Sequence, residues 1–133
     1  MTQVNEFLSQ LESYRGIVAC TTNLYRGLDQ ASLRRFVFKI EFHFLDAQRA
    51  RKLFHSLLAP LLGSPPSAEE AAWVERELAR IPNLTPGDFA IVARRQLALR
   101  DCGGAVVLST RGLIEELRAE VNAKEGAAQS IGF

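Results

Sequence analysis

The residue types best suited to chemistry lie in the N-terminal part of the chain. Thr21, Thr22 and Asn23 directly follow a short apolar run, and an asparagine amide at such a place can orient a water molecule or a phosphate oxygen. Arg34 and Arg35 are adjacent, and two charged guanidinium groups suit a phosphate or a carboxylate. Each feature also has a plainer interpretation, because an asparagine can simply satisfy its own loop and paired arginines commonly stay solvated.

The hydrophobic pattern predicts which elements position these residues. Apolar residues at helical spacing predict an amphipathic helix over residues 2–14. The uninterrupted apolar run at 17–20 favours a strand covered on both faces, as in a parallel sheet. Asp29 can cap a short helix that continues through Arg35. Residues 36–44 alternate between an aromatic face and a largely polar one, which is typical of a strand at or near a sheet edge.

The second part of the chain has helical spacing and predicts four helices. Asp46 is the expected N-cap of the first, Ser67 and Glu70 match a capping box, and Thr85 precedes a proline at the first helical position. The last helix opens at 109 or 110. The predicted buried faces comprise Ala50, Leu53, Phe54, Leu57, Leu58 and Leu61, then Ala71, Val74, Leu78 and Ile81, then Phe89, Val92, Ala93 and Leu97, and finally Leu113, Ile114, Leu117 and Val121.

The spacing of the chemically interesting residues resembles that of a known family. Thr-Thr-Asn, four residues, and then Leu-Asp-x-Ala-x-Leu-Arg-Arg-Phe is similar to the second region of homology of AAA+ ATPases, in the paired-arginine form of spastin- and katanin-like members. The segment 4–12 looks like the helix between the Walker B strand and the sensor strand of that family, and Thr-Pro-Gly-Asp-Phe at 85–89 is similar to the Gly-x-Asp segment of its helical lid. The resemblance covers most of the chain, strongly to about residue 60 and loosely thereafter.

The resemblance implies roles for individual residues. Asn23 matches sensor 1, which helps to position the attacking water near the γ-phosphate. Arg34 and Arg35 match the arginine fingers, which reach into the ATP site of a neighbouring subunit and stabilise transition-state charge. Gly87 and Asp88 match lid positions near the adenine and the ribose.

The resemblance also implies a fold and a domain organisation. We expect an α/β remnant, made of two strands of a parallel P-loop-type sheet with a flanking helix, followed by an all-α lid of about four helices. Residues 1–45 are assigned to the C-terminal part of the AAA+ α/β core, residues 46–125 to the helical lid and residues 126–133 to a tail. Arg94 and Arg95 lie a turn or more past the start of their helix and are interpreted as surface residues.

Two motifs of a working ATPase are missing from this sequence. It contains no Gly-x-x-x-x-Gly-Lys-Ser/Thr segment and no apolar strand that ends in Asp-Glu. The resemblance therefore implies the C-terminal portion of an AAA+ module, cut just after Walker B, whose parent uses ATP and Mg²⁺ in an oligomeric ring that remodels an unknown protein substrate. We expect this chain alone neither to hydrolyse ATP nor to bind it tightly. We also expect it to close its strand edges by pairing its two strands or by pairing with another copy.

Composition limits the remaining choices. Sixteen Lys and Arg against fifteen Asp and Glu give a net charge of +1, so nucleic acid and anionic membranes are not expected partners. Cys20 and Cys102 lie at no metal-site spacing, and no metal site is predicted. The first residues lack a signal-peptide pattern, and a cytoplasmic location is expected. The alternative function is a non-enzymatic helical module for assembly, which leaves the pattern at 21–36 as a coincidence.

Overall fold

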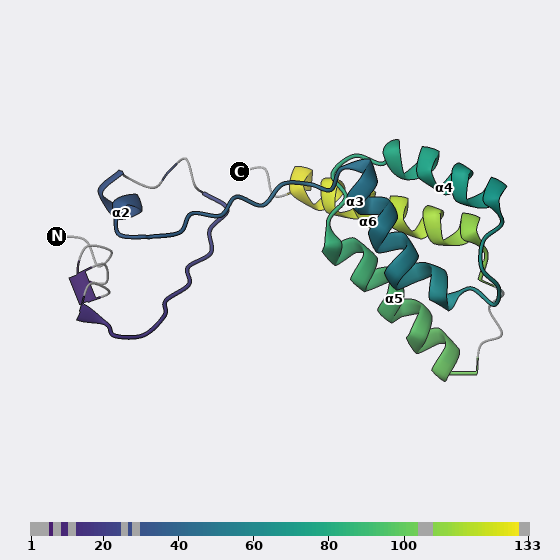
Figure 1. Ribbon diagram of the computed structural model, residues 1–133, viewed down its shortest axis with the longest axis horizontal. Helices are drawn as coiled ribbons and strands as arrows, with labels where there is room; N and C mark the ends of the chain where they lie inside the picture. Colours follow the sequence, from purple (N-terminus) through teal and green to yellow (C-terminus); the bar gives the residue numbers. More distant parts are fainter. Residues whose placement is uncertain are drawn as a thin grey trace. The chain divides into compact units, whose positions relative to one another are not determined.

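A computed structural model describes residues 6, 9, 10, 13–24, 27, 30–103 and 108–130 of the chain, which Figure 1 shows as a ribbon. The chain divides into two compact units, Met1–Phe42 and His43–Phe133. All regular secondary structure of the described part is helical. In chain order its elements are α2 (Gln30–Arg34), α3 (Ala47–Leu53), a π-helical turn η2 (Phe54–Leu58), a 3₁₀ turn η3 (Ala59–Leu61), α4 (Ala68–Ala79), α5 (Pro86–Asp101) and α6 (Thr110–Ser130).

The α/β fold class expected from the sequence is wrong, because neither predicted strand forms in the described part of the chain. Residues 17–20 and 36–44 are irregular chain without a β-ladder. Most of their apolar side chains lie in solvent, with Ile17 98%, Phe38 84% and Phe42 90% exposed. A strand exists only where a neighbouring strand satisfies its backbone N–H and C=O groups. Alternation along one segment predicts the two faces of a strand, but it cannot supply that neighbour.

The first unit contains one helix that the structure describes throughout. The helix α2 buries Ser32, and the N–H of Arg35 donates to Ser32 O at 3.2 Å just after the helix ends. Of the helix predicted over 2–14, residues 6, 9, 10 and 13 are described and are helical. Residue 14 is described and is not helical, and the remaining positions of that prediction lie outside the described residues. The predicted cap Asp29 also lies outside them.

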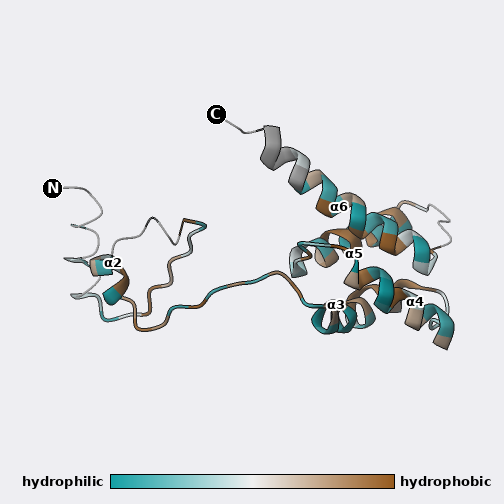
Figure 2. Ribbon diagram, turned by 90° about the horizontal axis from the view of Figure 1, so that it is seen from above, coloured by the Kyte–Doolittle hydropathy of each residue, from teal (hydrophilic) through white to brown (hydrophobic). Residues whose placement is uncertain are grey.

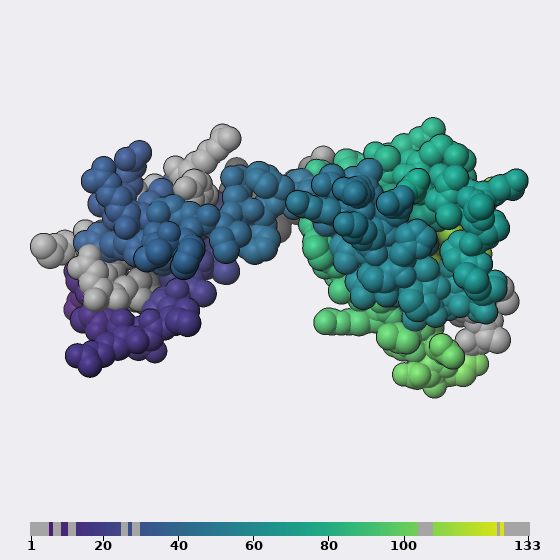
Figure 3. Space-filling model, viewed as in Figure 1, coloured from purple at the N-terminus to yellow at the C-terminus, as the bar shows by residue number. Residues whose placement is uncertain are grey.

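The second unit is a bundle of α3, α4, α5 and α6. The helix α6 packs against α4 and α5, and α3 packs against the same two helices (Figure 1). The helices of the bundle carry both hydrophobic and hydrophilic residues (Figure 2). The packed side chains of the unit form a continuous surface (Figure 3). Its core consists of Ala50, Phe54, Leu58, Val74, Leu78, Ile81, Leu84, Phe89, Val92, Leu113, Ile114, Leu117 and Val121.

The predicted helix starts are confirmed by their hydrogen bonds. Asp46 Oδ1 accepts from the N–H of Arg49 at 2.7 Å. In the capping box of α4, the Ser67 N–H donates to Glu70 Oε2 at 2.9 Å and the Glu70 N–H donates to Ser67 Oγ at 3.2 Å. Ser109 Oγ accepts from the N–H of residue 112 at 3.0 Å, which makes this serine the cap of α6. Each bond satisfies a backbone N–H that the first helical turn leaves without an intrahelical partner.

The helix that begins with α3 does not continue regularly to Leu61. Pro60 has no N–H to donate to Ser56 O, and its ring would collide with that carbonyl in a regular α-helix. The chain widens into a π turn, in which the Ala59 N–H donates to Phe54 O, and then tightens into a 3₁₀ turn. Leu57, which the sequence placed on the buried stripe, is consequently 39% exposed.

The last helix extends to Ser130, so residues 126–130 are helical although the sequence assigned them to a tail. Among the described helices, none combines the length and the apolar character that crossing a membrane requires.

Truncation of a core leucine tests this packing. Replacing Leu117 by alanine should lower the free energy of unfolding by about 2–5 kcal/mol, because the side chain is fully buried and its removal leaves a cavity. Leu97→Ala is the matched control, since it removes the same atoms from a side chain that is 45% exposed, and it should cost less than about 1.5 kcal/mol. Urea denaturation measures both, and equal losses would contradict the packing described.

Candidate functional site

The three residues predicted to act on phosphate lie in the first unit. Asn23 is exposed at a bend, next to a turn in which Thr22 Oγ1 accepts from the N–H of Leu24 at 2.9 Å. Arg34 is the last residue of α2 and is exposed. Arg35 follows it, is also exposed, and donates from Nη1 to a main-chain carbonyl oxygen of α2 at 3.2 Å. All three polar side chains are thus carried by surface positions.

The two residues predicted to lie near the nucleoside belong to the second unit, at the first turn of α5. Gly87 is exposed, and a Cβ there would lie 3.5 Å from Thr85 Oγ1, an ordinary contact. Asp88 is buried, with 2% of its surface exposed. Its Oδ2 accepts from the Thr85 N–H at 2.8 Å, from Thr85 Oγ1 at 2.9 Å and from Lys124 Nζ at 2.7 Å. The carboxylate therefore anchors the start of α5 to α6.

The predicted site is therefore divided between the two units. Asn23, Arg34 and Arg35 lie in one unit, while Gly87 and Asp88 are neighbours in the other. Within the second unit a separate hollow of about 380 Å³ lies beside the π turn and includes none of these residues. It is lined by His55, Ala59, Pro60, Leu62, Gly63, Ser64, Pro65 and Pro66.

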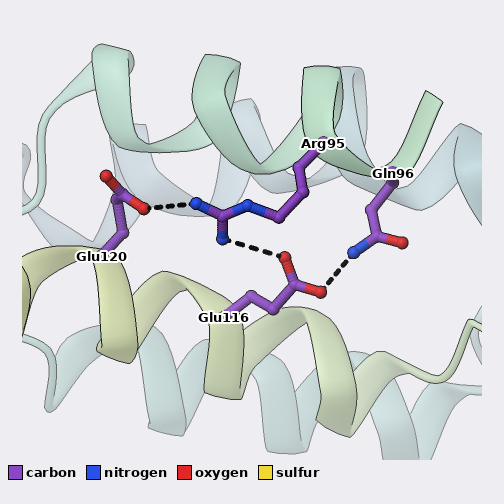
Figure 4. Close-up of polar contacts among 4 residues, drawn as sticks. All are labelled: Arg95, Gln96, Glu116 and Glu120. Atoms are coloured by element: carbon purple, nitrogen blue, oxygen red, sulfur yellow. Dashed lines mark hydrogen bonds and ion pairs between the residues drawn. The ribbon is translucent and has the colours of Figure 1, made fainter. Parts of the chain in front are cut away.

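A polar cluster between α5 and α6 was not expected from the sequence. Arg95 donates from Nη2 to Glu120 at 2.9 Å and from Nη1 to Glu116 at 3.4 Å (Figure 4). These hydrogen bonds, led by the one to Glu120, raise the pKa of Arg95 above its usual value. Gln96 donates from Nε2 to Glu116, and its Oε1 is buried without a hydrogen-bond partner in the described structure. Arg95 is exposed, as predicted for a surface residue, and it also links two helices, which was not predicted.

The buried face of α5 differs from the predicted one at one position. Phe89 and Val92 are buried as expected, whereas Leu97 is half-exposed and Gln96 is buried in its place. Positions 89, 92 and 96 have helical spacing in the sequence, but position 96 was not predicted to be buried because glutamine is polar. Only the acceptor on α6 explains why a glutamine lies at this position.

A second buried acid connects α4 to α6. Glu77 is 8% exposed and accepts from Arg80 Nη1 at 3.0 Å and from Arg118 Nη2. Arg111 lies over the Trp73 ring, 5.4 Å from its centroid, and links the same two helices by a cation–π contact. These polar contacts fix neighbouring helices and do not converge on a common cavity.

No cluster of three or more His, Cys, Asp or Glu that could hold a metal occurs among the residues that the structure describes. The two cysteines are both free and exposed. In comparisons with known proteins, no family model, no curated protein and no solved structure matches this chain.

Removing the lysine that pairs with Asp88 tests the anchoring role of that carboxylate. Lys124→Met should lower the free energy of unfolding by about 2–4 kcal/mol, because it leaves a buried carboxylate with only the Thr85 donors. Lys52→Met is the control, since it removes an exposed lysine of α3. Thermal and urea denaturation give the comparison. Similar stability of the two variants would mean that the carboxylate does not anchor α5.

The α4 capping box predicts a specific pH dependence. The Ser67 N–H and hydroxyl lower the pKa of Glu70 below its ordinary value of 4.5, because they bond to the ionised form. The folded pKa lies below the unfolded one, so this contribution to stability is present above the unfolded pKa. It is lost as pH falls through the folded pKa.

The stability difference between wild type and Glu70→Gln should therefore be largest near neutral pH and shrink below about pH 4. The glutamine keeps an acceptor in the box but cannot ionise. Glu69→Gln is the control, since it removes a charge from the same turn outside the box. Urea denaturation between pH 3 and pH 7 measures both. A Glu70→Gln difference that does not change with pH would contradict the prediction.

Proposed function

We propose that this chain contributes sensor 1, two arginine fingers and a helical lid to the ATP site of an AAA+ ATPase that works as an oligomeric ring. The observation that carries the proposal is the spacing of Asn23, Arg34 and Arg35 within the stretch 21–36. The four-helix bundle that follows supports it, because a separate helical unit after that stretch is what a lid requires. ATP with Mg²⁺ is the cofactor of the complete site, and it binds weakly to this chain alone.

The side chains present fit this chemistry in part. Asn23, Arg34 and Arg35 are exposed and offer amide and guanidinium donors, which suit phosphate oxygens and an attacking water. Bound between subunits, the nucleotide would supply the bond that is hydrolysed. The two arginines would hold developing negative charge, and the asparagine would orient the water.

The lid residues play different parts in this proposal. Gly87 is exposed and leaves its backbone open to close approach. Asp88 does not fit as a direct ligand of the nucleoside, because its carboxylate is buried against Thr85 and Lys124. We propose that Asp88 acts by holding the first turn of α5 in position.

The proposed partners are like subunits and a protein substrate. The net charge of +1 gives no electrostatic reason for nucleic acid or an anionic membrane to be the main partner. ATP hydrolysis in such a ring would take place in the cytoplasm.

A second candidate function is a non-enzymatic helical module that mediates assembly. One observation favours it: residues from 43 onward have a hydrophobic core and interhelical ion pairs of their own. This alternative gives Asn23, Arg34 and Arg35 no role. Substitution of those three residues therefore separates the two functions.

The ATPase proposal predicts activity only when the phosphate-binding half is supplied. The 133-residue chain alone should show no ATP turnover. Joined to the Walker A- and Walker B-bearing half of a spastin-like ATPase, it should support hydrolysis, measured as phosphate release. Arg34→Ala and Arg35→Ala should each lower kcat by about a thousandfold, because they remove transition-state charge stabilisation.

Arg94→Ala is the matched control, since it removes an exposed arginine of α5, and it should leave kcat unchanged. Asn23→Ala should lower kcat with little effect on KM, because water is positioned in the chemical step. Arginine-dependent turnover by the pure chain would overturn the proposal. A folded chimaera whose activity is indifferent to both arginines would favour the assembly module instead.

A further inference from the structure

The largely exposed segment 36–44 carries a symmetric pattern, and the residues proposed to act on ATP lie outside it. The even-numbered positions of the segment carry only large apolar side chains, namely Phe36, Phe38, Ile40, Phe42 and Phe44. Phe38, Ile40 and Phe42 are 84%, 76% and 90% exposed, and no strand of the described chain pairs with them. A continuous apolar stripe on a segment that forms no β-ladder in the described chain is a template for pairing with another chain.

We propose that this segment pairs antiparallel with the same segment of a second copy, in the register centred on Ile40. A two-fold axis at Ile40 places Phe36 opposite Phe44 and Phe38 opposite Phe42, so that all the aromatic side chains of both strands share one face. The backbone N–H and C=O groups of the two strands then satisfy one another.

The charges on the other face select this register. Centred on Ile40, the pairing puts Lys39 directly opposite Glu41, and the two-fold symmetry makes this opposite-charge pair twice. Moving the centre to Lys39 places two lysines face to face, and moving it to Glu41 places two glutamates face to face. Moving the two-fold axis by only half a residue places the aromatic residues of one strand opposite the largely polar positions of the other, so that the aromatic side chains no longer share one face. In the single chain, Lys39 Nζ donates to Phe36 O at 2.8 Å, an exposed contact that pairing would replace.

This inference rests on the pattern of one segment and is independent of the ATPase proposal. The even-numbered positions of the segment are uncharged and uninterrupted by polar residues, and Lys39 and Glu41 at the odd-numbered positions are complementary to each other. A second copy supplies both halves of that complementarity. Failure of the pairing would leave the roles proposed for Asn23, Arg34 and Arg35 untouched, because those residues lie outside the segment.

Charge exchange in the full chain tests the pairing. Light scattering during size exclusion should give twice the 14.8 kDa mass of one chain. Lys39→Glu and Glu41→Lys should each raise the dissociation constant of the dimer about tenfold or more, since each variant faces itself with like charges. An equimolar mixture of the two variants should dimerise again, as should the double variant that carries both exchanges in one chain. A monomeric wild-type chain, or variants indifferent to mixing, would overturn the proposal.

Cross-linking tests the register itself. In a Cys20→Ser, Cys102→Ser background, Ile40→Cys places a thiol opposite its own symmetry mate and should form a covalent dimer on mild oxidation. Phe42→Cys is the control, because its partner position is residue 38 and its own copy lies several residues along the strand, beyond disulfide reach. Equal cross-linking of the two variants would overturn the register, and absence of cross-linking in both would overturn the pairing.

Discussion

Burial of one face of α6 is the interaction on which the helical unit depends. Leu113, Ile114, Leu117 and Val121 are each at most 1% exposed, and the helix that carries them packs against α4 and α5. Most of the stability of a helix in water comes from such packing of an apolar face and little from its own propensity. Because protein interiors are close-packed, a change in volume at one of these positions is felt by both neighbouring helices.

The polar contacts of the bundle are arranged around that same helix. Asp88 is tied to Lys124, Glu77 to Arg118 and Arg95 to acids of α6. The ion pairs of the partly exposed Arg95 add little to the free energy of unfolding, since water competes for the charged groups. The buried carboxylates behave differently, because each would be costly without its partner. Together these contacts join α4 and α5 to α6.

The two segments predicted to be strands form no β-ladder in the described chain. Residues 17–20 and 36–44 have the composition of strands, yet they lack the neighbours that a sheet requires. Helices satisfy their backbone hydrogen bonds within one segment, so each helix of the bundle forms from residues close in sequence. A strand depends on a partner from elsewhere in the same chain or from another chain. The residues with the strongest chemical signal, Asn23, Arg34 and Arg35, lie in the unit that forms no sheet in the described residues.

Local sequence was sufficient wherever a structure depends on residues three or four positions apart. The caps at Asp46, Ser67 and Ser109 follow from such spacing, as does the buried face of α6, because both arise within one or two helical turns. Proline at position 60 was equally visible, but the way the chain accommodates it was not. A helix can respond to a proline by kinking, by ending or by widening, and packing selects among these responses.

The sequence by itself determined the helical periodicity, the caps and the spacing of the candidate phosphate-binding residues. The tertiary structure decided that Asp88 is buried against Lys124, that Gln96 replaces Leu97 on the inner face of α5, and that Arg95 joins two helices. Those three outcomes depend on residues at least 20 positions apart, as the pairing of residue 96 with residue 116 illustrates. A pattern read along one helix contains no information on which side chains another helix will bring to it.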